Sequence, residues 1–190
     1  MTQFEFVFVL YALVLGLSVV ELLSGFGRAM EYKFARAAEH KAFAIGWLTP
    51  LFAVFVLLDL ISFWIFAWVV RDLVAVNSLT ISAITAFAAA YYLAARLVFP
   101  SEPEAFVDLD VHFYRIRRVV LGILFALVIV QWIYLWSHAS LAPILEDPQA
   151  LAMTIVLLAL MGAAMATRND RLNIVLLAAL IVRYLYLYVT

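Results

Sequence analysis

Long apolar segments alternate with short polar connections along the whole chain. A bilayer core about 30 Å thick is crossed by roughly 20 apolar residues in a helix. Only helices satisfy their own backbone in lipid without closing a barrel, and these segments are too long for barrel strands. We therefore predict an all-α membrane protein, a compact single-domain bundle of six transmembrane helices, with spans at about 4–28, 43–70, 78–98, 117–137, 150–167 and 172–189.

The composition agrees with lipid as the main solvent. Hydrophobic residues make up 68% of the 190 residues, and the mean hydropathy is +1.10. Soluble domains are about 45–50% apolar. The net charge of −1 gives no general attraction to nucleic acid, and the lack of cysteine excludes disulfides and cysteine metal sites. Residues 1–8 carry only Glu5 as a charge, so we expect no cleaved signal peptide. We also predict no cofactor.

Basic residues predict the orientation. Ten of the twelve lysines and arginines follow the first, third or fifth span, and the other two are Arg71 and Arg183. The positive-inside rule places the ten on the cytoplasmic side, so both termini are predicted to face the periplasm. The ten residues are Arg28, Lys33, Arg36, Lys41, Arg96, Arg115, Arg117, Arg118, Arg168 and Arg171.

Aromatic residues gather where the second, fourth and sixth spans are expected to end on the outer side. Tryptophan and tyrosine are enriched at membrane interfaces, so these residues predict an interfacial belt. An aromatic binding site is the alternative. The residues are Trp64, Trp68, Trp132, Trp136, Tyr184, Tyr186 and Tyr188.

Small residues recur at helical spacing in the third and fifth spans. Such faces let helix backbones approach closely in lipid. We predict that they place these two spans near the bundle centre, and that Gly16 admits a neighbour to the first span. Self-association into a homo-oligomer, or contact with a membrane-protein partner, is the alternative. The faces are Ser82, Ala86, Ala90 and Ala94, and Ala159, Gly162, Ala163 and Ala166.

Three ionisable residues, Glu21, Asp59 and Arg183, lie inside the predicted spans. Ionisable groups at depth are costly and are candidates for functional sites. At 1.5 Å per residue, Asp59 lies about 18 Å from Arg71 and Arg183 about 18 Å from Arg171. Their similar depth predicts an ion pair between Asp59 and Arg183. Alternatively, Arg183 extends outward to the interface and leaves Asp59 neutral or near water.

Glu21 lies about 10 Å inside the cytoplasmic boundary marked by Arg28. Arg28 shares its helix face, and Arg96 near the end of the third span is a second partner. One interpretation is a structural ion pair that joins the first and third spans. The other is a protonatable or cation-binding carboxylate in a transport path, since desolvation raises the pKa of a carboxyl group. A third interpretation is that Glu21 is a catalytic acid.

The segment before the fourth span is acidic and then basic. We expect Asp108 or Asp110 to cap the following helix. Arg115, Arg117 and Arg118 are expected at the level of the lipid headgroups, with anionic lipid as their partner. No metalloprotease, serine-hydrolase or phosphate-loop motif occurs, so we predict no catalytic residue. The histidines lie on connections at opposite sides, which argues against a metal or haem site.

Three segments carry a resemblance. These are "LVLGLSVVELLSGFGR" (13–28), "LVFPSEPE" (97–104) and "VDLDVHFYRIRRVVLGIL" (107–124). Over roughly residues 5–135 the chain resembles a family of uncharacterised bacterial multi-pass inner-membrane proteins, which open with an LGLxxxELLxGxGR-like helix. The resemblance implies six or so helices in the bacterial inner membrane and no activity. A glutamine at the position of Glu21 in such relatives would favour a hydrogen-bonding role over proton transfer.

These observations favour two hypotheses of function. The first is a small channel or transporter for an ion or small solute, with Glu21, Asp59, Arg183 and Arg96 along its path. The alternative is a non-catalytic scaffold or accessory subunit that binds membrane lipid or a protein partner. The buried charges favour transport, whereas the short loops and few polar residues favour the scaffold.

Overall fold

The computed structural model describes residues 3–38 and 43–189, so Lys41 and His40 lie outside the described residues. In this described part the chain is helical and has no strand. The helices are α1 (Gln3–Ala38), α2 (Leu48–Val69), α3 (Ser78–Val98), α4 (Leu109–Trp136), α5 (Ala142–Glu146), α6 (Pro148–Ala166) and α7 (Asp170–Val189), with 3₁₀ turns η1 (Arg71–Leu73), η2 (Pro103–Ala105) and η3 (Ala139–Leu141).

The prediction of six membrane-spanning helices is confirmed by the length and composition of α1, α2, α3, α4, α6 and α7. The third span begins and ends at the predicted residues. The first continues through the connection to Ala38, so its 36 residues reach about 54 Å, well beyond a bilayer core. The fourth begins at Leu109, before the predicted start, because residues 109–116 form the first turns of the same helix.

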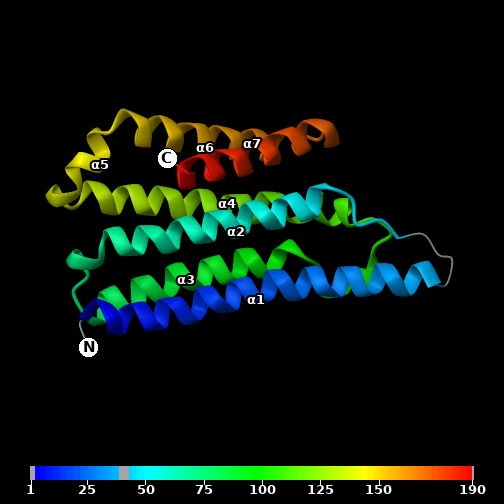
Figure 1. Cartoon of the computed structure of the whole chain (residues 1–190), viewed down its shortest axis with the longest axis horizontal. Helices are drawn as coiled ribbons and strands as arrows, with labels where there is room; N and C mark the ends of the chain where they lie inside the picture. The colour runs from blue at the N-terminus through cyan, green and yellow to red at the C-terminus, as the bar shows by residue number, and fades with distance from the viewer. Residues whose placement is uncertain (1–2, 39–42, 190) are drawn as a thin grey trace.

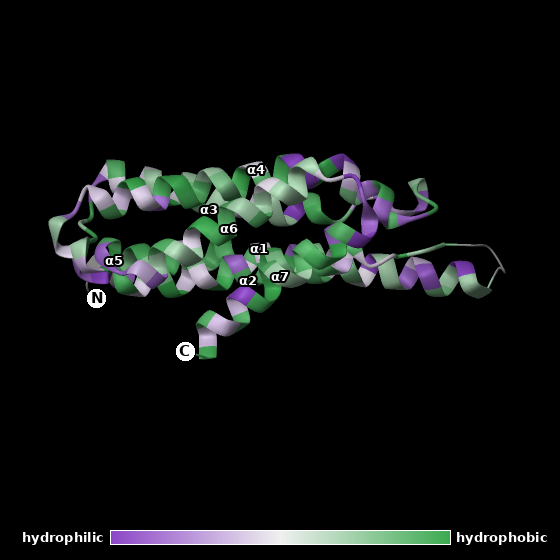
Figure 2. Ribbon diagram, turned by 90° about the horizontal axis from the view of Figure 1, so that it is seen from above, coloured by the Kyte–Doolittle hydropathy of each residue, from purple (hydrophilic) through white to green (hydrophobic). Residues whose placement is uncertain are grey.

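The six long helices lie in two layers of three. One layer holds α1, α2 and α7, and the other holds α3, α4 and α6 (Figures 1 and 2). Both termini lie toward the end that holds the α2–α3 connection, and α1 projects from the opposite end (Figure 1). Figure 2 shows hydrophilic residues gathered toward the two ends and hydrophobic residues between them. We call the end with most of the arginines the basic end and the other the terminal end.

The small-residue faces differ from the prediction. In α3, Ala94 is buried against its neighbours, whereas Ser82 and Ala86 nearer the terminal end are exposed. The face therefore packs only in its half toward the basic end. The prediction that the fifth span is central is wrong, because α6 lies at one edge of its layer and exposes Ala159 and Gly162. Its bulkier residues Leu157 and Met161, together with Ala164, are the buried ones.

Close approach occurs at Gly25 instead of Gly16. Nothing lies within 4 Å of a Cβ atom at Gly16, so the prediction for this residue is wrong. A Cβ atom at Gly25 would lie 2.7 Å from Cβ of Phe99. Glycine at this position thus lets the end of α3 pack directly on α1.

The two predicted capping residues serve different helices. Asp108 caps α4, where its carboxylate accepts a hydrogen bond from the Asp110 amide at 2.8 Å. The Asp110 carboxylate instead crosses to the start of α2, where it accepts from the amides of Leu48 at 3.0 Å and Thr49 at 3.3 Å. These amides have no partner within their own helix. Two aspartates at the start of α4 thereby cap two helices.

Gly46 makes this crossed cap possible. Its φ of +68° lies in the left-handed region, where side chains are disfavoured. A Cβ atom there would collide with the carboxylate of Asp110. The backbone nearby is joined as well, since the Ala44 amide donates to Val107 and the Leu109 amide donates to Ala44. The starts of α2 and α4 are therefore fixed to each other.

Candidate functional site

Asp59 lies at the centre of the bundle and is 1% exposed. The hydroxyl of Tyr91, on α3, donates to its Oδ2 at 2.9 Å. The hydroxyl of Tyr184, on α7, donates to its Oδ1. One carboxyl group on α2 thus joins three helices from both layers. Buried polar groups normally have such partners, because an unpaired one is costly in a low dielectric.

Arg183 does not pair with Asp59, so the predicted ion pair is wrong. Its Nε donates to the Met153 carbonyl of α6 at 2.8 Å, and its guanidinium lies 4.8 Å from the Tyr184 ring centroid. Among the described ion pairs none joins the two side chains. The depth estimate was consistent with a pair, but two tyrosine hydroxyls occupy the carboxylate and a helix carbonyl accepts from the arginine.

The predicted aromatic belt needs a correction at one residue. Tyr184 is buried beside Asp59 instead of lying at an interface. Tyr188 donates to the Leu58 carbonyl at 2.6 Å, which adds a second link between α7 and α2. Trp68 and Trp136 are exposed near the terminal end, as a belt requires.

Glu21 contacts both of its predicted arginine partners. Its Oε1 lies 3.2 Å from Nη1 of Arg96 and 3.4 Å from Nη2 of Arg28. The carboxylate side chain is 20% exposed. The contact across α1 and α3 that the sequence predicted is confirmed. One carboxylate between two guanidiniums is held by opposite charge on both sides, close to the basic end.

Arg117 has partners within the protein. It is 2% exposed, and Nη1 donates to the carbonyls of Ala164, at 2.8 Å, and Thr167. These carbonyls belong to the last turn of α6, where a cation is favourable and acceptors are otherwise unpaired. The prediction of a lipid partner for Arg117 is corrected accordingly: its guanidinium caps α6.

A buried polar network behind Arg117 was missed by the sequence analysis. Asn173 on α7 is fully buried, and its Nδ2 donates to the Tyr114 hydroxyl at 3.2 Å and to the Thr167 carbonyl at 3.1 Å. Tyr114 in turn donates to the Asp170 carboxylate. The only signal in the sequence was an asparagine near the start of the sixth span, which is costly in lipid unless bonded.

A basic pocket of about 460 Å³ opens beside this network. It is lined by Tyr114, Arg115, Arg117, Arg118 and Arg168. Arg115, Arg118 and Arg168 are exposed, and no acidic residue lines the pocket. The Arg118 Nε donates to the Met165 carbonyl at 3.3 Å, which directs this side chain toward the end of α6. The pocket therefore presents concentrated positive charge at the basic end.

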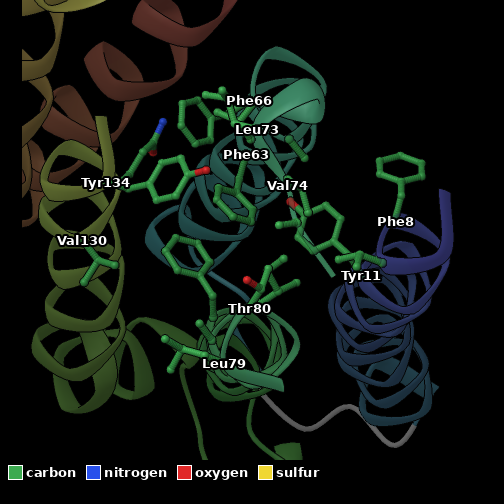
Figure 3. Close-up of a pocket in the computed structure, with 18 of the residues that line it drawn as sticks. Phe8, Tyr11, Phe63, Phe66, Leu73, Val74, Leu79, Thr80, Val130 and Tyr134 are labelled. Atoms are coloured by element: carbon green, nitrogen blue, oxygen red, sulfur yellow. The ribbon is translucent and has the colours of Figure 1, made fainter. Parts of the chain in front are cut away.

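A second cavity, of about 510 Å³, lies at the terminal end between α1, α2, α3 and α4 (Figure 3). Its walls are mostly aliphatic and aromatic, with Asn77, Thr80, Gln131 and His138 among the polar residues that line it. Sequence reasoning missed it, because a cavity depends on how helices diverge and no single helix pattern records that. Residues of the described chain form no group of three histidines or carboxylates able to hold a metal.

Comparison of the chain with protein-family models, with curated proteins and with solved structures gives no match. The resemblance to a bacterial inner-membrane family stays a prediction, and function has to be argued from the geometry of these sites.

Proposed function

We propose that this chain is a non-catalytic scaffold or accessory subunit of the bacterial inner membrane, held at its basic end by anionic lipid. In this proposal the termini face the periplasm, as the distribution of arginines and lysines favours. The observation that carries the proposal is the basic pocket, where four arginines from α4 and the α6–α7 connection meet.

The chemistry of this pocket suits a phosphate group. Guanidinium groups present a planar set of donors that matches phosphate oxygens, and they remain charged at any physiological pH. Each arginine near an anionic membrane surface contributes about 1 kcal/mol. Arg117 is fixed by α6, so Arg115, Arg118 and Arg168 are the exposed charges left for a headgroup.

The two buried carboxylates support the scaffold over the transport hypothesis. Glu21 lies between two arginines, and Asp59 accepts from two tyrosines. Both therefore have partners that join helices, as a structural role requires. The two cavities described above lie at opposite ends, and neither is lined by Glu21 or Asp59.

Lipid binding can be measured by native mass spectrometry of the detergent-purified protein. We expect cardiolipin or phosphatidylglycerol to be retained in preference to phosphatidylcholine, with affinity that falls as salt rises. A variant with Arg115→Gln, Arg118→Gln and Arg168→Gln should lose about tenfold or more in affinity. Arg71→Gln is the matched control, because Arg71 lies at the terminal end and does not line the basic pocket. Equal retention of all lipids by wild type and variant would overturn the proposal.

Transport is the second candidate, and the buried Asp59 carboxyl at mid-depth is the observation that favours it. A proteoliposome flux assay with Asp59→Asn and Glu21→Gln beside wild type tests it. Proton or ion flux in wild type that either variant abolishes would favour transport over the scaffold. A C-terminal reporter fused after Thr190 tests the orientation and should read as periplasmic.

A further inference from the structure

The cavity at the terminal end has a volume suited to a ligand. Its 510 Å³ lies within the range of about 300–1,000 Å³ found for small-molecule sites. Four helices form its walls, and the η1 turn and the start of α3 border it (Figure 3). It lies at the opposite end of the bundle from the basic pocket, so it is a separate site.

The walls select for a neutral and apolar ligand. Aliphatic and aromatic side chains make up most of them. Phe63 and Phe87 stack with centroids 4.2 Å apart, and Tyr11 meets Phe63 edge to face at 5.2 Å. No aspartate, glutamate, lysine or arginine is among the described residues that line the cavity. An ion buried here would have no opposite charge, which is strongly unfavourable.

Tyr11 is the most deeply buried of the polar side chains that line the cavity, which also include Asn77, Thr80, Gln131, Tyr134 and His138. Tyr11 is 4% exposed, and within the described residues its hydroxyl has no hydrogen-bond partner. Tyr91 and Tyr184, the other deeply buried tyrosines, both donate to Asp59. Buried hydroxyl groups nearly always have a partner, since an unpaired one is costly. Figure 3 shows the hydroxyl of Tyr11 directed into the cavity, with that of Tyr134 on the opposite wall also directed inward.

We propose that this cavity binds a neutral amphiphile whose carbonyl or hydroxyl oxygen accepts a hydrogen bond from Tyr11. The apolar body of the ligand packs against Phe63, Phe87 and the aliphatic residues around them. Two classes of membrane compound share this chemistry: quinones with an apolar tail, and uncharged alcohols or glycerides. The proposal does not depend on lipid binding at the basic pocket.

The test compares three probes by equilibrium binding to the full chain in nanodiscs: a decyl-substituted quinone, oleyl alcohol and octadecene, which lacks oxygen. We expect at least one oxygenated probe to bind more tightly than octadecene. Whichever of the quinone and oleyl alcohol binds more tightly identifies the class of the ligand. Tyr11→Phe should weaken that binding about fivefold, the value of one hydrogen bond, and leave octadecene unchanged. Tyr92→Phe is the matched control, because Tyr92 lies on α3 outside the cavity.

A second pair of variants tests the location. Ala83 lines the cavity, whereas Ala86, one turn along the same helix, does not. Ala83→Phe should abolish binding of every probe, and Ala86→Phe should leave it intact. Equal affinities for all three probes would show nonselective occupation by lipid tails and overturn the proposal. Equal effects of Tyr11→Phe and Tyr92→Phe would do so as well.

Discussion

The two ends of the bundle are held together by different kinds of contact. At the basic end, polar side chains cross between helices: Glu21 meets Arg96, Asp110 caps α2, and Arg117 caps α6. At the terminal end the contacts are mostly aromatic and aliphatic, and they enclose a cavity with an unpaired hydroxyl. The comparison shows which contacts determine how the helices of such an apolar chain pack together.

In a membrane the hydrophobic effect contributes little to the packing of one helix against another, because lipid tails are as apolar as leucine. Directed hydrogen bonds and close backbone approach therefore fix the helix positions. Both are concentrated at the basic end, where Gly25 admits Phe99 and Gly46 admits Asp110. The terminal end lacks comparable links among the described residues that surround the cavity, so its helices leave room between them.

The largest expected effect is from Arg117→Ala. This change removes a buried cation and its hydrogen bonds to the Ala164 and Thr167 carbonyls, of which the Thr167 carbonyl keeps one from Asn173. We expect a loss of about 3 kcal/mol in the free energy of unfolding. Denaturation in mixed micelles measures it. Arg118→Ala, an exposed neighbour, should cost much less; equal losses would contradict the assignment of Arg117 as the cap of α6.

Gly46→Ala tests the crossed cap. The methyl group would collide with the Asp110 carboxylate and would require a disfavoured φ. We expect a loss of about 2 kcal/mol from strain and a displaced cap. Gly27→Ala is the control, because nothing lies within 4 Å of a Cβ atom there. A melting temperature that is unchanged by Gly46→Ala but lowered by Gly27→Ala would be inconsistent with this packing.

At the terminal end we expect a substitution that stabilises the protein instead of destabilising it. Tyr11→Phe removes a buried hydroxyl that has no partner in the described protein. Ligand-free protein should therefore gain about 1 kcal/mol in stability. Tyr91→Phe should instead destabilise, since the Tyr91 hydroxyl donates to Asp59. Thermal unfolding of the delipidated protein measures both, and destabilisation by Tyr11→Phe would show that its hydroxyl is already satisfied.

We expect the smallest change in the free energy of unfolding from Glu21→Gln. The carboxylate and its arginines are partly exposed, and solvent weakens such pairs. We expect a loss of about 0.5 kcal/mol, which high salt should reduce. A stability difference that is independent of salt would show that the charge of Glu21 does not supply the contact.

Sequence reasoning predicted correctly those features that depend only on position along the chain. The apolar runs located six helices, and matching depths at one boundary correctly paired Glu21 with Arg96. Depth alone failed for Asp59 and Arg183, because it does not tell which way each side chain faces around its helix axis. The hydroxyls of Tyr91 and Tyr184 were the true partners.

The remaining features depend on how helices are arranged relative to one another. The pattern identified Asp110 as a capping residue but did not show that it caps a helix that begins 62 residues earlier in the chain. The exposed small faces of α6 and the terminal cavity also follow from the relative placement of whole helices. No periodicity within a single segment encodes that placement.

The crossed cap also has a consequence for synthesis in the cell. The amide of Leu48 lies 62 residues before the carboxylate of Asp110 that caps it. At translation rates of about 5–20 residues per second, that carboxylate follows the start of α2 by about 3–12 s. During this interval the newly inserted α2 has an incomplete N-terminus, and its final position is fixed only when the start of α4 emerges from the ribosome.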